Sequence, residues 1–351
     1  MNKKLIAMAV ASVFAAPLSV QAVDFSASGF ADVTLNIADD SCDNPNGNGG
    51  ITFASGGVGA ATACTSTATD VDGGAANSTE GKFNAAGEVD FMATEGDLTV
   101  RMDVDLFLDA SAADSASLEQ GFFSWNIYDG LALKGGLFNN PVGLEANDAP
   151  DIWSVSQGQI FNILDSQTSL HAGNNLTGAA VVFGAGPANI QVGLLNEISG
   201  DAEANSLLFT VDGEVMDGLA LELGVLTQED NTVANAGSME NLIDLNAVWK
   251  MAGWTVAGEI LTAGKVVDNA LMLLGNYDFG NGWGVTGRYD MVSFENSAND
   301  DDTTMTLVGI WKPTDNLTTN LEYRKLENGE SGVAEVSEDS IVLEFIATVG
   351  S

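Results

Sequence analysis

The stretch DLTVRMDVDLFL, residues 97–108, alternates apolar and polar side chains from Asp97 to Leu106. Leucine, valine or methionine stands at every second position, and the positions between them carry aspartate, threonine or arginine. This period of two is that of a β-strand whose two faces meet different surroundings. One face has no polar residue and the other is mostly charged, so the strand separates an apolar medium from a polar one.

The same alternation recurs along the chain, for example from Trp283 to Met291 and from Leu317 to Tyr323. An even number of antiparallel strands is typical of barrels that cross the bacterial outer membrane, because a closed sheet satisfies every backbone group in lipid. The sequence therefore predicts an all-β, transmembrane antiparallel β-barrel. We expect sixteen strands, at 24–36, 82–94, 97–108, 118–127, 131–138, 176–184, 188–197, 205–214, 219–227, 241–250, 253–263, 269–279, 282–293, 303–312, 316–326 and 338–347.

The connections between these strands alternate in length, which predicts short periplasmic turns and long extracellular loops. The short ones carry the glycine, aspartate, asparagine or proline that tight hairpins require. They are 95–96, 128–130, 185–187, 215–218, 251–252, 280–281 and 313–315. The long polar ones are 37–81, 109–117, 139–175, 198–204, 228–240, 264–268, 294–302 and 327–337.

Five of the six tryptophans lie close to a short turn and in the apolar phase of their strands. One interpretation is an aromatic girdle at a single membrane interface. The alternative is that aromatic residues simply favour strands. The five are Trp125, Trp249, Trp254, Trp283 and Trp311.

The first 22 residues have the pattern of a secretory signal peptide, with Lys3 and Lys4 before an apolar stretch and a small residue, Gln21 and Ala22 at its end. We therefore expect two parts, the signal at 1–22 and the barrel at 23–351. No other segment approaches the roughly 20 apolar residues of a spanning helix. The predicted location is the outer membrane of a Gram-negative bacterium.

The chain is strongly acidic, with a net charge of −38. The signal contains two of the 11 basic residues and none of the 49 acidic ones, so the remainder carries −40. Nucleic acid is excluded as a partner, because its binding depends on Lys and Arg contacts with phosphates. The acidity fits a solvated surface in a salty habitat or an entrance that attracts cations, and the sequence leaves both open.

The two cysteines, Cys42 and Cys64, lie in the first long loop. In an exported protein such a pair predicts a disulfide, which contributes on the order of 3 kcal/mol for a loop of this length. We predict no metal site, cofactor or catalytic residue, because His171 is the only histidine and no nucleophile motif accompanies it.

The stretch GGLFNNPVGLE, residues 135–145, is similar to the run that ends the fifth strand in Gram-negative outer-membrane porins of the OmpL-like kind. The resemblance implies a water-filled channel for passive diffusion of small polar solutes and ions. It also implies that the third loop, 139–175, folds into the lumen and forms a constriction. One departure is the end of the chain, where Phe345 is followed by IATVGS instead of a terminal aromatic residue.

The third loop carries the acids Glu145, Asp148 and Asp151 and no Lys or Arg. A connection this long in a compact fold is usually functional or disordered. Its apolar residues, among them Ile152 and Ile160, favour packing inside the barrel over a solvated external loop.

The polar phase of the strands predicts which residues line the lumen. It contains twelve acids and four bases, a net charge of −8, so cations should be favoured. The acidic loop and a basic wall would set a transverse field, although ordinary ion pairs in the wall explain the same residues. The basic candidates are Arg101, Lys134, Arg288 and Arg324, and the principal acidic ones are Glu88, Asp90, Asp103, Asp105, Asp290 and Glu322.

The sequence therefore predicts a cation-preferring porin and not an enzyme. Its expected partners are outer-membrane lipid, lipopolysaccharide, small solutes and cations, with monomer and homotrimer both open. The alternative is a surface adhesin or receptor whose external loops bind a partner. Ion conduction separates the two, because an adhesin need not conduct.

Overall fold

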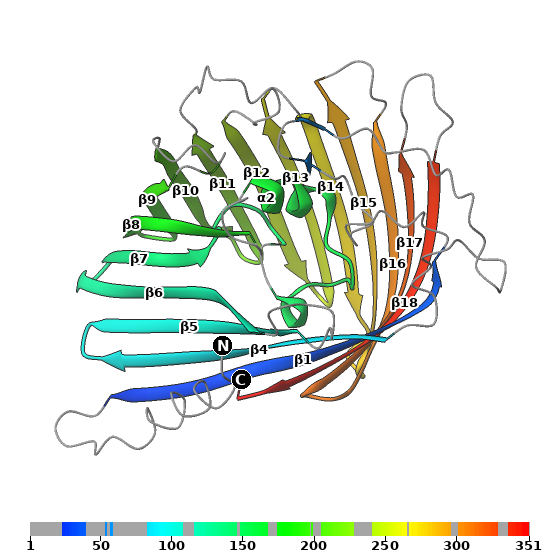
Figure 1. The fold of residues 1–351 in the computed structure, drawn as a ribbon, viewed down its shortest axis with the longest axis horizontal. Helices are drawn as coiled ribbons and strands as arrows, with labels where there is room; N and C mark the ends of the chain where they lie inside the picture. The colour runs from blue at the N-terminus through cyan, green and yellow to red at the C-terminus, as the bar shows by residue number, and fades with distance from the viewer. Residues whose placement is uncertain are drawn as a thin grey trace.

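The computed structural model describes residues 23–39, 53–54, 57–58, 83–107, 116–145, 148–167, 174–196, 198, 205–227, 241–264, 267–295, 301–328 and 336–350. Sixteen strands form one closed antiparallel barrel, shut by the pairing of β1 with β18 (Figure 1). The predicted fold class is confirmed, and each predicted strand overlaps an observed one with ends that differ by at most three residues.

The barrel strands are β1 (Asp24–Asp39), β4 (Phe83–Glu95), β5 (Leu98–Phe107), β6 (Ala116–Tyr128), β7 (Leu131–Asn139), β8 (Asn175–Ala185), β9 (Ala188–Asn196), β10 (Asn205–Met216), β11 (Leu219–Thr227), β12 (Leu242–Met251), β13 (Trp254–Ala263), β14 (Val267–Asp278), β15 (Trp283–Phe294), β16 (Asp302–Thr314), β17 (Leu317–Asn328) and β18 (Val336–Val349). A separate two-stranded sheet pairs β2 (Phe53–Ala54) with β3 (Gly57–Val58). The third loop contains a short 3-10 helix, η1 (Ala149–Asp151), and the helix α2 (Gln159–Gln167).

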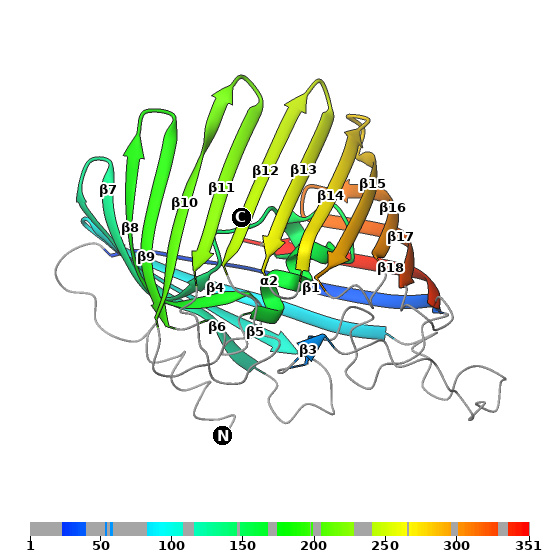
Figure 2. The ribbon, with the colours of Figure 1, turned by 90° about the horizontal axis from the view of Figure 1, so that it is seen from above.

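All seven short turns lie at the same end of the barrel, where β1 begins and β18 ends. Figure 2 shows several of these hairpins side by side along one edge. The turns depend on glycine, since Gly218 has a φ of 75° and a Cβ there would lie 2.3 Å from the Lys250 carbonyl oxygen. The short connections thus lie at one end of the barrel and the long ones at the other, as the sequence predicts.

The alternation seen in β5 places apolar side chains outside and polar ones inside. Leu98, Val100 and Met102 are exposed on the outer face, whereas Asp103 is fully buried in the interior. The outer face of the other strands is likewise rich in exposed leucine, valine and aromatic residues. A surface this apolar suits a hydrocarbon environment and not water.

The five tryptophans predicted to share one end all lie exposed next to short turns. Trp283 stacks on Trp311 with 5.7 Å between ring centroids, and Trp254 lies 4.6 Å from Tyr277. These contacts join neighbouring strands into a partial aromatic band at that end of the barrel. Among the described residues, no helix is long and apolar enough to span a bilayer.

Cys42 and Cys64 lie outside the described residues, so their disulfide stays a prediction. Alkylating the unfolded, unreduced mature protein should label no thiol, because export exposes the pair to an oxidising compartment. Reduction before alkylation should label two. Two labelled thiols without reduction would refute the disulfide.

Candidate pore and the loop inside the barrel

The described residues of the third loop, 140–145, 148–167 and 174, lie inside the barrel. The loop leaves β7 at Asn139, and α2 packs against β14 and β15 before the chain enters β8. Figure 1 shows α2 within the ring of strands. The position of this loop decides which inward side chains can meet solvent.

One side of the loop is held by apolar packing. Ile160, Ile163 and Leu164 of α2 are at most 2 % exposed and join one cluster with inward side chains such as Leu261 and Met272. Full burial of a side chain of this size contributes about 1.5–3 kcal/mol. The inner face of β14 is apolar from Val267 to Leu274, where the helix and not water covers it.

The rest of the loop is held by carboxylates of the wall that accept hydrogen bonds from its backbone. The Gly143 N–H donates to Glu222 at 3.2 Å and the Leu144 N–H donates to Glu259 at 2.8 Å. Farther around the barrel, on β17, Glu322 accepts a hydrogen bond of 2.7 Å from the Val155 N–H. Buried amides need such acceptors, so these contacts fix the path of the loop.

A buried ionic group centred on Arg288 ties the start of α2 to β15. The Arg288 guanidinium lies 3.0 Å from Glu145 in the loop and 3.0 Å from Asp290 on its own strand. The two carboxylates also accept hydrogen bonds from the Gly158 and Gln159 N–H groups at the N-terminus of α2. Negative charge is favourable at that end of a helix, so one group satisfies the arginine and caps the helix.

The two described loop acids with shifted pKa values are both held in confined surroundings. Burial raises the pKa of Glu145, while the Arg288 guanidinium and the Gly158 amide oppose the rise. Burial also raises the pKa of Asp148, repulsion from Asp90 adds to it, and Arg101 opposes it. Asp148 therefore reaches the wall formed by β4 and β5.

The predicted basic residues face the interior but are already engaged. Arg101 forms ion pairs with Asp90 at 3.3 Å and Asp103 at 2.8 Å, with its own side chain 36 % exposed. The Lys134 ammonium lies over the Phe122 ring at 4.3 Å from its centroid. Lys134 is also 4.5 Å from the centroid of Phe138, and Arg324 is half-buried.

Several residues predicted to line open water are instead covered. Asp290 and Glu322 point inward but are buried because the loop binds them, and Glu145 is only 3 % exposed because it pairs with Arg288. Arg288 and Glu145 thus touch instead of facing one another across a pore. Glu88 and Asp103 are also buried, while Asp105 and Asp148 are half-buried and Asp151 is exposed.

Glu119 belongs to the same interior wall, although the strand alternation did not identify it. The pairing of β5 with β6 shifts between Asp103 and Val104, which pair with Gln120 and Leu118. This β-bulge leaves Glu119 as an extra residue that lies, like Gln120, on the inner side. Only a break in the period of two within LEQG marks it in the sequence.

The closed sixteen-stranded barrel is similar in fold to solved outer-membrane channels. The chain is similar to the anion-selective porin from Comamonas acidovorans, with a TM-score of 0.64 and 11 % identity over 93 % of this chain and 100 % of that one. It is also similar to the outer membrane channel DcaP of Acinetobacter baumannii, with a TM-score of 0.61 and 12 % identity over 94 % and 99 %. For OprB of Pseudomonas putida the TM-score is 0.60 and the identity 12 %, over 93 % and 94 %.

At these identities the likeness establishes the fold. No protein-family model matches the sequence, and no curated protein matches it.

Proposed function

We propose that this protein is an outer-membrane porin that lets small polar solutes and ions diffuse through its interior. The observation that supports this most is the third loop, which is bound inside a closed barrel whose inner face is polar and whose outer face is apolar. The OmpL-like motif at 135–145 lies where β7 leads into that loop. Outer-membrane lipid and lipopolysaccharide would surround the apolar face, with the tryptophan band at the periplasmic interface.

We further propose that the pore prefers cations. The accessible inner surface includes Asp148 and Asp151 of the loop, whereas Arg101 of the wall is paired with two acids. The interior thus keeps an excess of negative charge, which concentrates cations. Asp148 and Asp151 belong to the loop that narrows the path.

Planar-bilayer recording of the purified mature protein tests the proposed channel. We expect ohmic, stepwise conductance in simple salt solutions, because a bound loop leaves a permanent polar path and no gate is required. A barrel that folds fully but never conducts would contradict the porin and favour the adhesin. The same experiment with the heat-unfolded protein controls for detergent leaks.

A further inference from the structure

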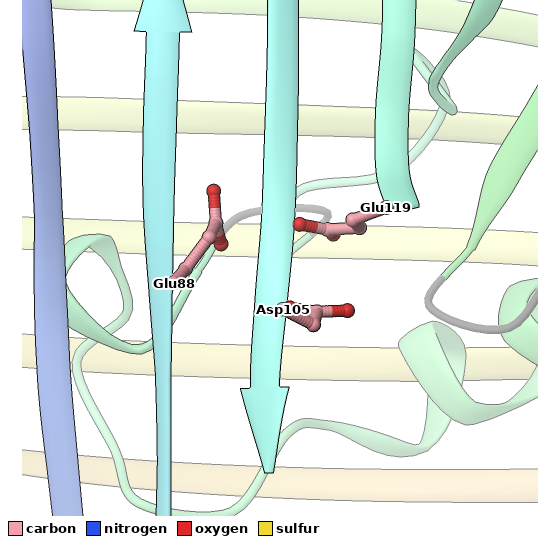
Figure 3. A group of neighbouring side chains, drawn as sticks. All are labelled: Glu88, Asp105 and Glu119. Carbon is pink, nitrogen blue, oxygen red and sulfur yellow. The ribbon is translucent and has the colours of Figure 1, made fainter. Parts of the chain in front are cut away.

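Three acidic side chains from adjacent strands meet on the inner wall. They are Glu88 on β4, Asp105 on β5 and Glu119 on β6, and each offers a carboxylate oxygen within 4.8 Å of the other two. Glu88 and Asp105 pair directly across β4 and β5. The bulge in β6 turns the Glu119 side chain to the same inner face, so that it joins them. Figure 3 shows Glu88 and Glu119 directed toward one another across β5.

The described residues offer this group few hydrogen-bond donors, and the Asn175 amide donates only a long bond of 3.5 Å to Oε1 of Glu119. Glu88 is 2 % exposed, and its Oε1 has no hydrogen-bond partner among the described residues. Oε2 of Glu119 likewise has no hydrogen-bond partner among the described residues. The neighbouring base, Arg101, pairs with Asp90 and Asp103 instead. Buried carboxylates without donors are costly, so a proton or a cation must complete the group.

The spacing of the three carboxylates permits a single bound cation. Calcium binds oxygens at about 2.3–2.6 Å, so two ligands on opposite sides of one ion are at most about 5 Å apart. Oxygens within 4.8 Å of one another fit around a single ion of this size. Calcium takes six to eight oxygens with flexible geometry, whereas magnesium demands a near-ideal octahedron and retains water.

We propose that Glu88, Asp105 and Glu119 bind one divalent cation, calcium in preference to magnesium. The ion replaces the protons that these carboxyl groups would otherwise share. Asp148 of the loop interacts directly with Glu88, so it is within reach as a further oxygen ligand. The cation then joins the loop to the wall of β4–β6, on the side away from the Arg288 group.

Calorimetric titration of calcium chloride into the chelator-treated mature protein in detergent tests this site. We expect the Glu88→Gln and Glu119→Gln variants to lose one bound calcium per chain relative to the unaltered protein, or to bind it at least tenfold more weakly. The matched control is Asp212→Asn on β10, where the carboxylate bonds to Asn189 outside the cluster. The calcium bound by Asp212→Asn includes the loose binding by other acidic residues, so the difference from this control measures the cluster alone.

Titration in two buffers of different ionisation heat supplies a second measurement, since calcium should release protons from the cluster. Asp105→Asn serves if either glutamate variant fails to form a barrel. Equal stoichiometry and affinity in folded cluster variants and in Asp212→Asn would overturn the site. Binding is measured without conduction, so failure here leaves the porin proposal standing.

Discussion

Replacing Arg288 with methionine is expected to release the third loop from the barrel wall. The substitution keeps the volume of the stem but leaves Glu145 and Asp290 buried without a cation. Breaking a buried ion pair by removing one partner costs about 3–5 kcal/mol. The barrel itself is closed by its strand ladder, so the loss should appear as opening of the loop and a larger conductance.

Hydrogen exchange of the loop amides measures this release. The Leu144 and Val155 N–H groups are bound to wall carboxylates and should exchange faster in Arg288→Met. The matched control is Lys325→Met, because the Lys325–Glu327 pair is exposed and exposed ion pairs contribute little to stability. Unchanged exchange and conductance in Arg288→Met would show that the ionic group does not hold the loop.

A triple variant separates lost charge pairing from a general defect in packing. Arg288→Met with Glu145→Gln and Asp290→Asn removes the arginine together with the two charges that it compensates. Exchange of the loop amides should return toward that of the unaltered protein, because no uncompensated charge stays buried. The single and triple variants behaving alike would point to the missing hydrogen bonds from Arg288 to Ser154 and Ser156.

Neutralising Asp148 and Asp151 together is expected to lower the cation preference of the pore. A unit charge about 7 Å from a passing ion is worth about 0.6 kcal/mol in water, and screening at 0.1 M salt reduces the effect to roughly twofold in cation occupancy per charge. The preference should fade at 1 M salt, where the screening length is about 3 Å. Reversal potentials in a salt gradient measure the change.

Two further variants give that experiment its direction. Arg101→Gln should raise the cation preference, because it frees the charge of Asp90 and Asp103. Asp129→Asn is the control, since Asp129 is exposed in the short turn between β6 and β7, away from the loop. Anion selectivity of the unaltered protein at low salt would contradict the proposed preference outright.

The barrel itself could be predicted because its signals are local. A period of two in 97–106 depends only on which side of one strand each residue takes. The sorting of short and long connections depends only on the distance between strands along the chain. The tryptophan band follows from the same two signals, since Trp283 and Trp311 are both near short turns and on the apolar face.

What the sequence by itself determined was therefore the strand number, the two faces of the strands apart from β6 at Glu119, and the acidic character of the interior. Only the tertiary structure decided which acids meet solvent, because the loop contacts join residues separated by 79 to 167 positions in the chain. In the folded barrel, Glu322 and Asp290 accept hydrogen bonds from the loop backbone instead of facing water. The bulge that turns Glu119 inward likewise depends on how β6 pairs with β5, which no period along a single strand encodes.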